Sequence, residues 1–311
     1  MVFAFLPHGL LPMRTTLIDN HMSSLVIKRI IISIICLFLL SSCSTRLTYN
    51  FLDWWLAWTI NDYIDLNHQQ STVIKQHINH FHRWHRRHEL PRYVNFLTKA
   101  QHRLNQGPID ATELSQLSDE AVNLLQASIN QLVIPAKELL TTLTPDQTTS
   151  LFENLKEKNQ EFKVKYADLS TKESKRRRVK RMRQFLKPWV GRLNKQQHSF
   201  IEQWAERFLP SWQLILQERH LWQTQLAYTL TLPHDTKEFH EETTQLLIYP
   251  EDRWSSDYRQ CLAYNQQLTM ELFAAINNSL TKKQIKRRNR HFQDYIQDLT
   301  HLSDKTKEAS D

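Results

Sequence analysis

The chain has 311 residues and a formal net charge of +8, with a pI of about 9.3. It holds only three glycines, of which Gly107 and Gly191 lie beyond the first forty residues. Phosphate loops, dinucleotide-binding turns and nucleophile elbows each need several glycines, so this composition excludes those enzyme classes. The chain also lacks an HExxH or a CxxC sequence. We therefore expect a protein that is not an enzyme and has no cofactor.

Residues 28–43 follow the pattern of a lipoprotein signal peptide. Lys28 and Arg29 form a basic segment, and residues 30–40 are an apolar run too short to span a bilayer. The sequence Leu-Ser-Ser-Cys that ends at Cys43 resembles a lipobox. We predict that residues 1–42 are removed and that Cys43 is acylated; residues 1–21 would be surplus if translation starts at Met22. An ordinary signal peptide and an uncleaved anchor are the alternatives.

The residues after Cys43 predict where the mature chain resides. Ser44 replaces the aspartate that retains lipoproteins in the inner membrane of enteric-type bacteria, so we expect an anchor in the outer membrane, facing the periplasm. Cleavage removes three basic residues and one acidic residue, so the mature chain stays basic. A periplasmic location excludes nucleic acid as the partner of this charge. Cys261 is the one cysteine left free, so no disulfide can form within the chain.

The spacing of apolar residues predicts an all-α protein, a bundle or curved layer of about seven to nine helices, several of them long and kinked at proline. One stripe, from Ile201 to Leu226, keeps its phase across Pro210 and predicts a single kinked helix over 195–230. Other stripes predict helices over 114–139, 145–169 and 285–302. We expect one helical domain over residues 43–302 and a flexible tail over 303–311.

A short motif recurs four times. It is a leucine followed directly by asparagine or threonine, with a glutamine three residues after that second position. The copies end at Gln70, Gln147, Gln197 and Gln284. Each has the pattern of a capping box, in which Asn or Thr caps a helix and Gln binds the cap's backbone amide. We interpret them as four separate helix starts, because their uneven spacing excludes a regular solenoid.

Two segments carry a family resemblance. The first runs from Tyr49-Asn50 through Asp53-Trp54 to Asp62-Tyr63 and on to Gln70; the second runs from Trp189 and Gly191 through Leu193-Asn194 to Gln197. With the lipobox, they resemble a family of uncharacterised proteobacterial lipoproteins known by a domain of unknown function. The resemblance spans most of the mature chain and implies the fold and the anchor, but no activity. The Leu-Thr-x-x-Gln copies are more weakly similar to a motif of Spy/CpxP-type periplasmic chaperones.

Two segments supply the candidate interaction surface. Phe51 and three tryptophans share one face of a helix shortly after Cys43, where core packing and contact with the membrane interface are both possible. Residues 172–183 hold eight basic side chains, which suit either a solvated helix or contact with anionic lipid or an acidic partner. Val179, Met182 and Leu186 leave a thin apolar seam between them. The surface residues are Trp54, Trp55, Trp58, Arg176, Arg177, Arg178, Lys180 and Arg181.

Five histidines over residues 77–88 raise the possibility of a metal site. Pairs such as His77 and His80 have helical spacing for one ion, but no cysteine or carboxylate joins them, and neighbouring arginines oppose a cation. We predict no metal there. The expected function is a non-enzymatic helical binding or scaffold protein of the cell envelope, with an envelope protein or anionic lipid as partner. An ATP-independent holdase and a metal-binding protein are the alternatives.

Overall fold

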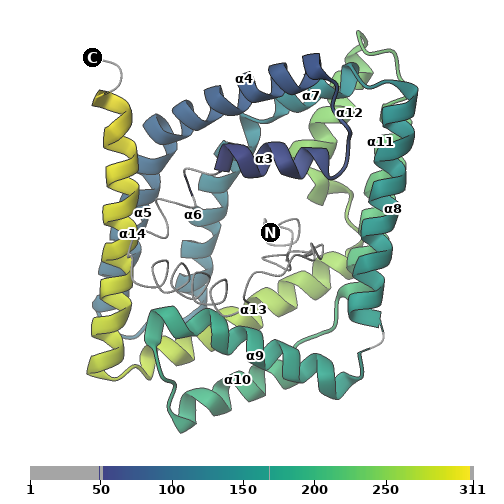
Figure 1. The fold of residues 1–311 in the computed structure, drawn as a ribbon. Coiled ribbons are helices and arrows are strands. Elements are labelled where there is room, and N and C mark those ends of the chain that lie inside the picture. The colour runs from purple at the N-terminus through teal and green to yellow at the C-terminus, as the bar shows by residue number, and fades with distance from the viewer. Residues whose placement is uncertain (1–48, 50–51, 168, 309–311) are drawn as a thin grey trace, which may run out of the picture.

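The structure is a computed structural model that describes Tyr49, residues 52–167 and residues 169–308. The signal segment and Cys43 lie outside these residues. The described chain consists of helices and their connections, with no strand among these residues, which confirms the all-α prediction. The helices form a four-sided frame (Figure 1). None of the described helices is long and apolar enough to serve as a membrane span.

The first half of the frame runs from the first described helix to Ala167. It contains α3 (Leu52–Asn61), α4 (His68–Trp84), a π-helical segment η2 (His85–Glu89), α5 (Leu90–Asn105), α6 (Ala111–Asn130), α7 (Val133–Thr141) and α8 (Pro145–Ala167).

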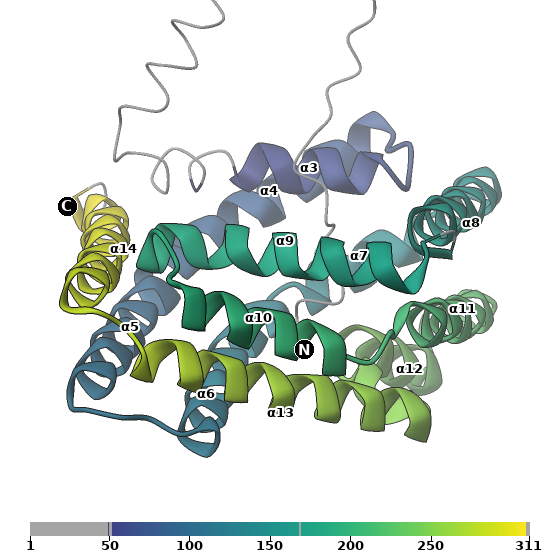
Figure 2. The same cartoon turned by 90° about the horizontal axis from the view of Figure 1, so that it is seen from below.

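Over the described residues 169–308, the second half likewise holds six α-helices and one short helical segment of another type. It contains α9 (Thr171–Val190), α10 (Lys195–Arg207), α11 (Trp212–Thr229), α12 (Lys237–Ile248), a short 3₁₀ segment η3 (Pro250–Arg253), α13 (Ser256–Asn278) and α14 (Lys282–Glu308). On one side of the frame, α9, α10 and α13 lie in successive layers (Figure 2).

Helices of one half pack against helices of the other in a reciprocal pattern. The third helix of each half lies against the last helix of the other, as α5 against α14 and α11 against α8. Likewise α6 packs on α13, and α12 packs on α7. Exchanged pairing of this kind gives the frame an approximate two-fold symmetry. The two halves therefore pack against each other through helices in corresponding positions.

The four recurring motifs meet in two pairs at matching corners of this symmetry. Gln70 Nε2 donates to Gln147 Oε1 at 3.0 Å, and Gln147 Nε2 donates back to Gln70 Oε1 at 2.7 Å. At the other corner, Gln197 and Gln284 exchange the same two bonds at 3.0 and 2.9 Å. All four glutamines also accept a bond from their cap's backbone amide, as the capping box predicts.

The interpretation as separate helix starts is therefore incomplete. Each glutamine ties its own helix to one that begins many residues away, and it also binds a backbone carbonyl at that corner. Gln70 Nε2 reaches the carbonyl of Thr142, and Gln197 Nε2 reaches that of Ser279. A buried carboxamide needs several partners, and only the paired arrangement supplies them.

Two stretches that were each predicted to be one helix form two helices in the structure. The predicted helix over 195–230 breaks between α10 and α11, where Phe208 is extended. The residue before a proline disfavours helical angles, and Asn265 of α13 binds both the backbone N–H and the carbonyl of Leu209. The predicted helix over 114–139 breaks between α6 and α7.

The predicted flexible tail also differs from the structure. The sequence analysis placed its start at Ser303, because the residues that follow are polar. Helix α14 instead continues through Glu308, and Ser303 is buried. The preceding Leu302 is 2% exposed, so packing orders this turn although its composition is polar.

Candidate functional site: the basic groove of helix α9

Helix α9 has well-defined ends that fix the position of its charges. Ser170 and Glu173 form a capping box at its start. At its end, Gly191 adopts a φ of 73°, in the left-handed region that favours glycine. The predicted apolar seam of Val179, Met182 and Leu186 is buried in a core shared with α10 and α13. Burial of this seam turns the remaining surface of the basic helix outward.

Some basic side chains of α9 form contacts with the neighbouring helix α10. Arg183 forms an ion pair with Glu202 of α10 at 2.8 Å, and Lys175 pairs with Glu206. The hydrogen bond from Lys175 lowers the pKa of the Glu206 carboxyl. Arg178 donates to the backbone carbonyl of Ala205 at 3.1 Å and lies over a phenylalanine ring. These three side chains hold α10 against α9.

Four other cations of α9 are exposed and form no hydrogen bond or ion pair within the described part of the chain. They follow one another on one face of the helix, together with an exposed glutamine. At about 100° per residue, the five side chains fall within about one third of the circumference. We call this set the cation stripe; it consists of Lys172, Arg176, Lys180, Gln184 and Lys187.

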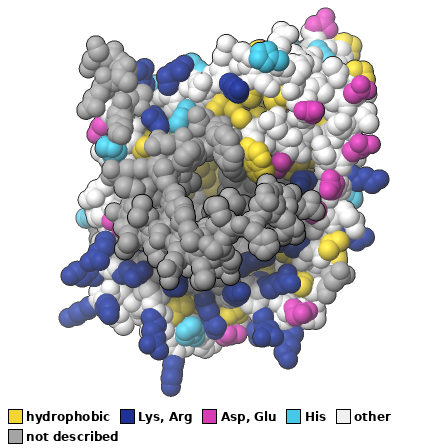
Figure 3. Space-filling view, in the orientation of Figure 1, with side chains coloured by type: hydrophobic (Ala, Val, Ile, Leu, Met, Phe, Trp, Pro, Cys, Tyr) yellow, Lys and Arg dark blue, Asp and Glu magenta, His cyan; other side chains and the backbone are white. Residues whose placement is uncertain are grey.

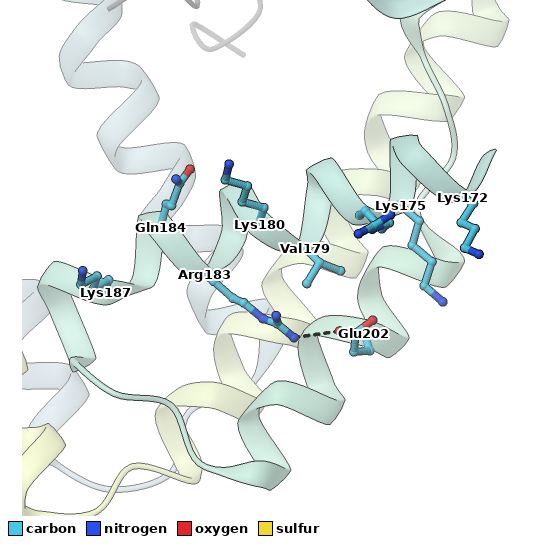
Figure 4. A pocket seen from close by; sticks show the side chains of 9 residues that line it. Lys172, Lys175, Val179, Lys180, Arg183, Gln184, Lys187 and Glu202 are labelled. Atoms are coloured by element: carbon cyan, nitrogen blue, oxygen red, sulfur yellow. Dashed lines mark hydrogen bonds and ion pairs between the residues drawn. The ribbon is translucent and has the colours of Figure 1, made fainter. Parts of the chain in front are cut away.

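The cation stripe lines a groove of about 610 Å³. Val179 and the paired Lys175, Arg183 and Glu202 complete its lining. Figure 4 shows Arg183 directed toward Glu202 on α10, whereas Lys180 and Gln184 point to the opposite side of α9. The groove is thus strongly basic, and its one carboxylate is already engaged by an arginine. Such a site suits an anionic ligand.

The structure divides the residues predicted for the interaction surface. Arg176 and Lys180 line the groove. Arg177 donates to a backbone carbonyl of α8 at 3.4 Å, and Arg181 lies over the ring of Tyr166, also on α8. Since Arg178 of α9 also contacts α10, three of the five predicted basic residues make contacts within the frame.

Of the three predicted tryptophans on α3, the structure describes the side chain of Trp58. Trp58 of α3 is 51% exposed. The side chains of Trp54 and Trp55 lie outside the described residues, so the choice between core packing and membrane contact stays open for them.

The histidine-rich segment makes contacts with tyrosines and a carboxylate. His77 Nε2 lies 2.7 Å from Glu138 of α7. His85 is buried, and its two ring nitrogens bond to the hydroxyls of Tyr49 at 2.8 Å and Tyr93 at 3.3 Å. Burial lowers the pKa of His85 to about 4. Among the described residues, no three His, Cys, Asp or Glu side chains converge as metal ligands would.

The face shown in Figure 3 is unevenly charged. Lys and Arg side chains gather over the lower part, around α9, α10 and the start of α14, whereas Asp and Glu lie mainly toward the upper right. Further exposed cations come from the loop after α9, the first residue of α10 and the first turns of α14; they are Arg192, Lys195, Lys282, Lys283 and Lys286. The groove is part of a larger basic region on this face.

Sequence reasoning missed the cation stripe as a unit. It counted charge over residues 172–183 and therefore left out Gln184 and Lys187. The signal that could have found them is the spacing of four, four, four and three residues, which places them on one helical face. The partners of the paired cations, Glu202 and Glu206, lie on the next helix, and no local pattern identifies them.

Residues 62–259 match the family described as "Family of unknown function (DUF6279)". The match covers more than half of the chain, so the protein belongs to this family, as the sequence resemblance predicted. It includes all of α9 and the groove, together with three of the four paired glutamines. The comparison with curated proteins and the comparison with solved structures both gave no match.

Proposed function

We propose that this protein is a lipid-anchored, non-enzymatic binding or scaffold protein of the cell envelope. Cys43 would hold it to the periplasmic face of the outer membrane, and the helical frame would present the α9 groove to a partner. The anchor rests on the lipobox sequence and on Ser44. The binding role rests on the groove.

The observation that carries the binding role is the division of the cations on α9. Lys175 and Arg183 are neutralised by α10, whereas the four cations of the stripe stay unpaired on one face. Like charges on neighbouring turns destabilise a helix by a few tenths of a kcal/mol per pair. A protein that needed only a stable helix would gain from an acidic neighbour here, so the unpaired face is consistent with a partner that supplies the negative charge.

Two measurements test the anchor. Mass spectrometry of the native protein should find acyl groups on an N-terminal Cys43, and Cys43→Ser should leave unprocessed precursor or released protein. Membrane fractionation should place the acylated protein in the outer membrane. An unmodified N-terminus elsewhere, or a purely inner-membrane location, would refute this part of the proposal.

A crosslinking experiment tests the binding role. A photoreactive residue at Lys180 of the intact lipoprotein should capture a specific envelope component in cells, while the same residue at Lys163 on α8 should not. The purified protein should also leave aggregation of several unrelated unfolding proteins unchanged. Suppression of that aggregation at near-stoichiometric ratio would replace the scaffold with a holdase.

A further inference from the structure

We propose that the α9 groove binds an acidic helical segment of a partner protein, with acidic side chains of the segment lying along the cation stripe. This inference rests on the proposed function and names the class of partner for the same surface. It is supported by the spacing of the cations, the rigidity of the groove and its position in the frame.

The spacing of the stripe matches that of another helix. Steps of four residues correspond to about 6 Å along an α-helix, so Lys172 and Lys187 lie about 22 Å apart along the axis. A second helix with Asp or Glu at every third or fourth position presents carboxylates at the same interval. Laid along the groove, it would place one carboxylate near each cation over about four turns. Gln184 would add a neutral donor and acceptor between two cations.

The groove is held in shape before a partner arrives. Arg183 with Glu202 and Lys175 with Glu206 bridge α9 to α10 along one wall. Val179 and the aliphatic stems of the long basic side chains form the remaining lining. Because the backbone of α9 is fixed by its buried seam, only the ends of the lysine and arginine side chains need to become ordered on binding.

The position of the groove favours a protein over the lipid that holds the anchor. Tyr49 is bonded to His85 and lies over α4 and η2. Five residues lie between it and Cys43, and the six residue steps reach about 20 Å when extended. Helix α5 starts directly after η2 and is about 24 Å long, and its far end meets the first turns of α14 through Arg288 and Asn105.

The reach of this linker is shorter than α5, which runs from η2 to the corner where α14 begins. Lys187 lies near this corner, because Gln284 in the first turn of α14 binds the carbonyl of Arg192 just after α9. The rest of the stripe continues along the side of the frame opposite α4 (Figure 1). An anchor held near η2 would leave the groove on the opposite side of the frame, where a partner in the periplasm could reach it.

A binding titration tests the proposal with the mature chain from Cys43, purified without its lipid. The probe is a fluorescent alanine-based helical peptide of about 22 residues with glutamate at every fourth position. Replacing Lys172, Arg176, Lys180 and Lys187 with Gln should weaken its binding at least tenfold near 0.1 M salt. Each exposed ion pair contributes modestly, but four are lost together. Binding to the unchanged chain should fall steeply as salt is raised.

A charge-matched variant provides the control. Lys75, Lys156, Lys163 and Arg259 are also exposed and without hydrogen bonds or ion pairs among the described residues, and they lie on α4, α8 and α13. Their replacement with Gln removes the same net charge and should leave the affinity within twofold. Charge reversal by Arg176→Glu and Lys180→Glu should abolish binding of the glutamate peptide and create binding of its lysine counterpart. Circular dichroism and thermal unfolding check that each variant is folded.

Two outcomes would overturn the inference. Equal weakening in both four-site variants would show that only net charge attracts the peptide. Binding to vesicles of phosphatidylethanolamine and phosphatidylglycerol at three to one, without binding of the peptide, would assign the stripe to lipid headgroups. Neither result bears on Cys43, so acylation of the native protein stays an independent test of the anchor.

Discussion

The two glutamine corners share one hydrogen-bond pattern but differ in burial and in charge. Gln197 is completely buried and Gln284 nearly so, whereas Gln147 at the other corner is only half-buried. Asp65 and Asp146 flank the first corner, and Arg192, Lys282 and Lys283 flank the second. The fold therefore fixes the paired carboxamides, while the exposed residues around them are free to carry opposite charge.

The halves also differ at the junction between their second and third helices, where each has a proline. In the first half, α4 passes into α5 through the π-helical segment η2, and Leu90 N–H bonds to the carbonyl of His85. In the second half, the chain breaks before Pro210, and Asn265 binds the exposed backbone of Leu209. A proline removes one helical hydrogen bond, and the two halves compensate in different ways.

The largest expected effect comes from breaking the buried corner. Gln197→Leu would leave the carboxamide of Gln284 and the carbonyl of Ser279 short of partners, so we expect a loss of about 3 kcal/mol of unfolding free energy. Gln70→Leu should cost about half as much, because water can reach the half-buried Gln147. Urea unfolding of both variants measures the difference. Equal losses would contradict the distinction between the corners.

Acid should weaken the first half before the second. The pKa of His85 is lowered to about 4 by burial, so the unfolded chain binds a proton at a higher pH than the folded chain does. The contribution of the neutral His85 to the free energy of unfolding is then fully present above about pH 6.5 and falls by about 3 kcal/mol as the pH drops to 4. Hydrogen exchange at pH 4.5 should show loss of protection in α4 and α5 before α10.

His85→Gln is the control for this acid effect. The variant should be less stable than the unchanged chain at pH 7 but should lose little more between pH 6.5 and 4. An unaltered pH dependence would assign the acid sensitivity to other groups.

A smaller effect is expected at the helix break. Asn265→Ala removes both bonds to Leu209, and we expect a loss of about 2 kcal/mol because the backbone N–H and carbonyl of Leu209 lose their side-chain partner. The nearby Gln267→Ala, at an exposed position on the same helix, should change stability by no more than about 0.5 kcal/mol. Thermal unfolding distinguishes the two. A neutral Asn265→Ala would show that the proline alone sets the break.

The smallest effect is expected at the end of α9. An added Cβ at Gly191 would lie 3.1 Å from Cδ of Arg287, and φ is positive there, so Gly191→Ala should cost about 1 kcal/mol. Gly107 also has a positive φ, but no atom lies near its added Cβ, so Gly107→Ala isolates the backbone contribution. Denaturant midpoints compare the two. A larger cost at Gly107 would show that contact with Arg287 is unimportant.

The sequence determined the local elements of this protein because their signals are local. Helical spacing predicted α8 and α14, and the capping boxes predicted the starts of α4 and α10. The apolar seam of α9 follows from the positions of Val179, Met182 and Leu186. Each prediction depends on residues within a few turns of one another.

Which of these elements lie against each other depends on the tertiary structure. The pairing of Gln197 with Gln284 depends on two chain segments that no local pattern connects, and Asn265 ends a helix more than fifty residues before it. The same holds for the charges of α9. Its sequence supplies a nearly continuous run of cations, but contact with α10 and α8 neutralises or packs some of them and leaves the cation stripe exposed. Burial and pairing are properties of neighbours in space, and the fold alone brings those neighbours together.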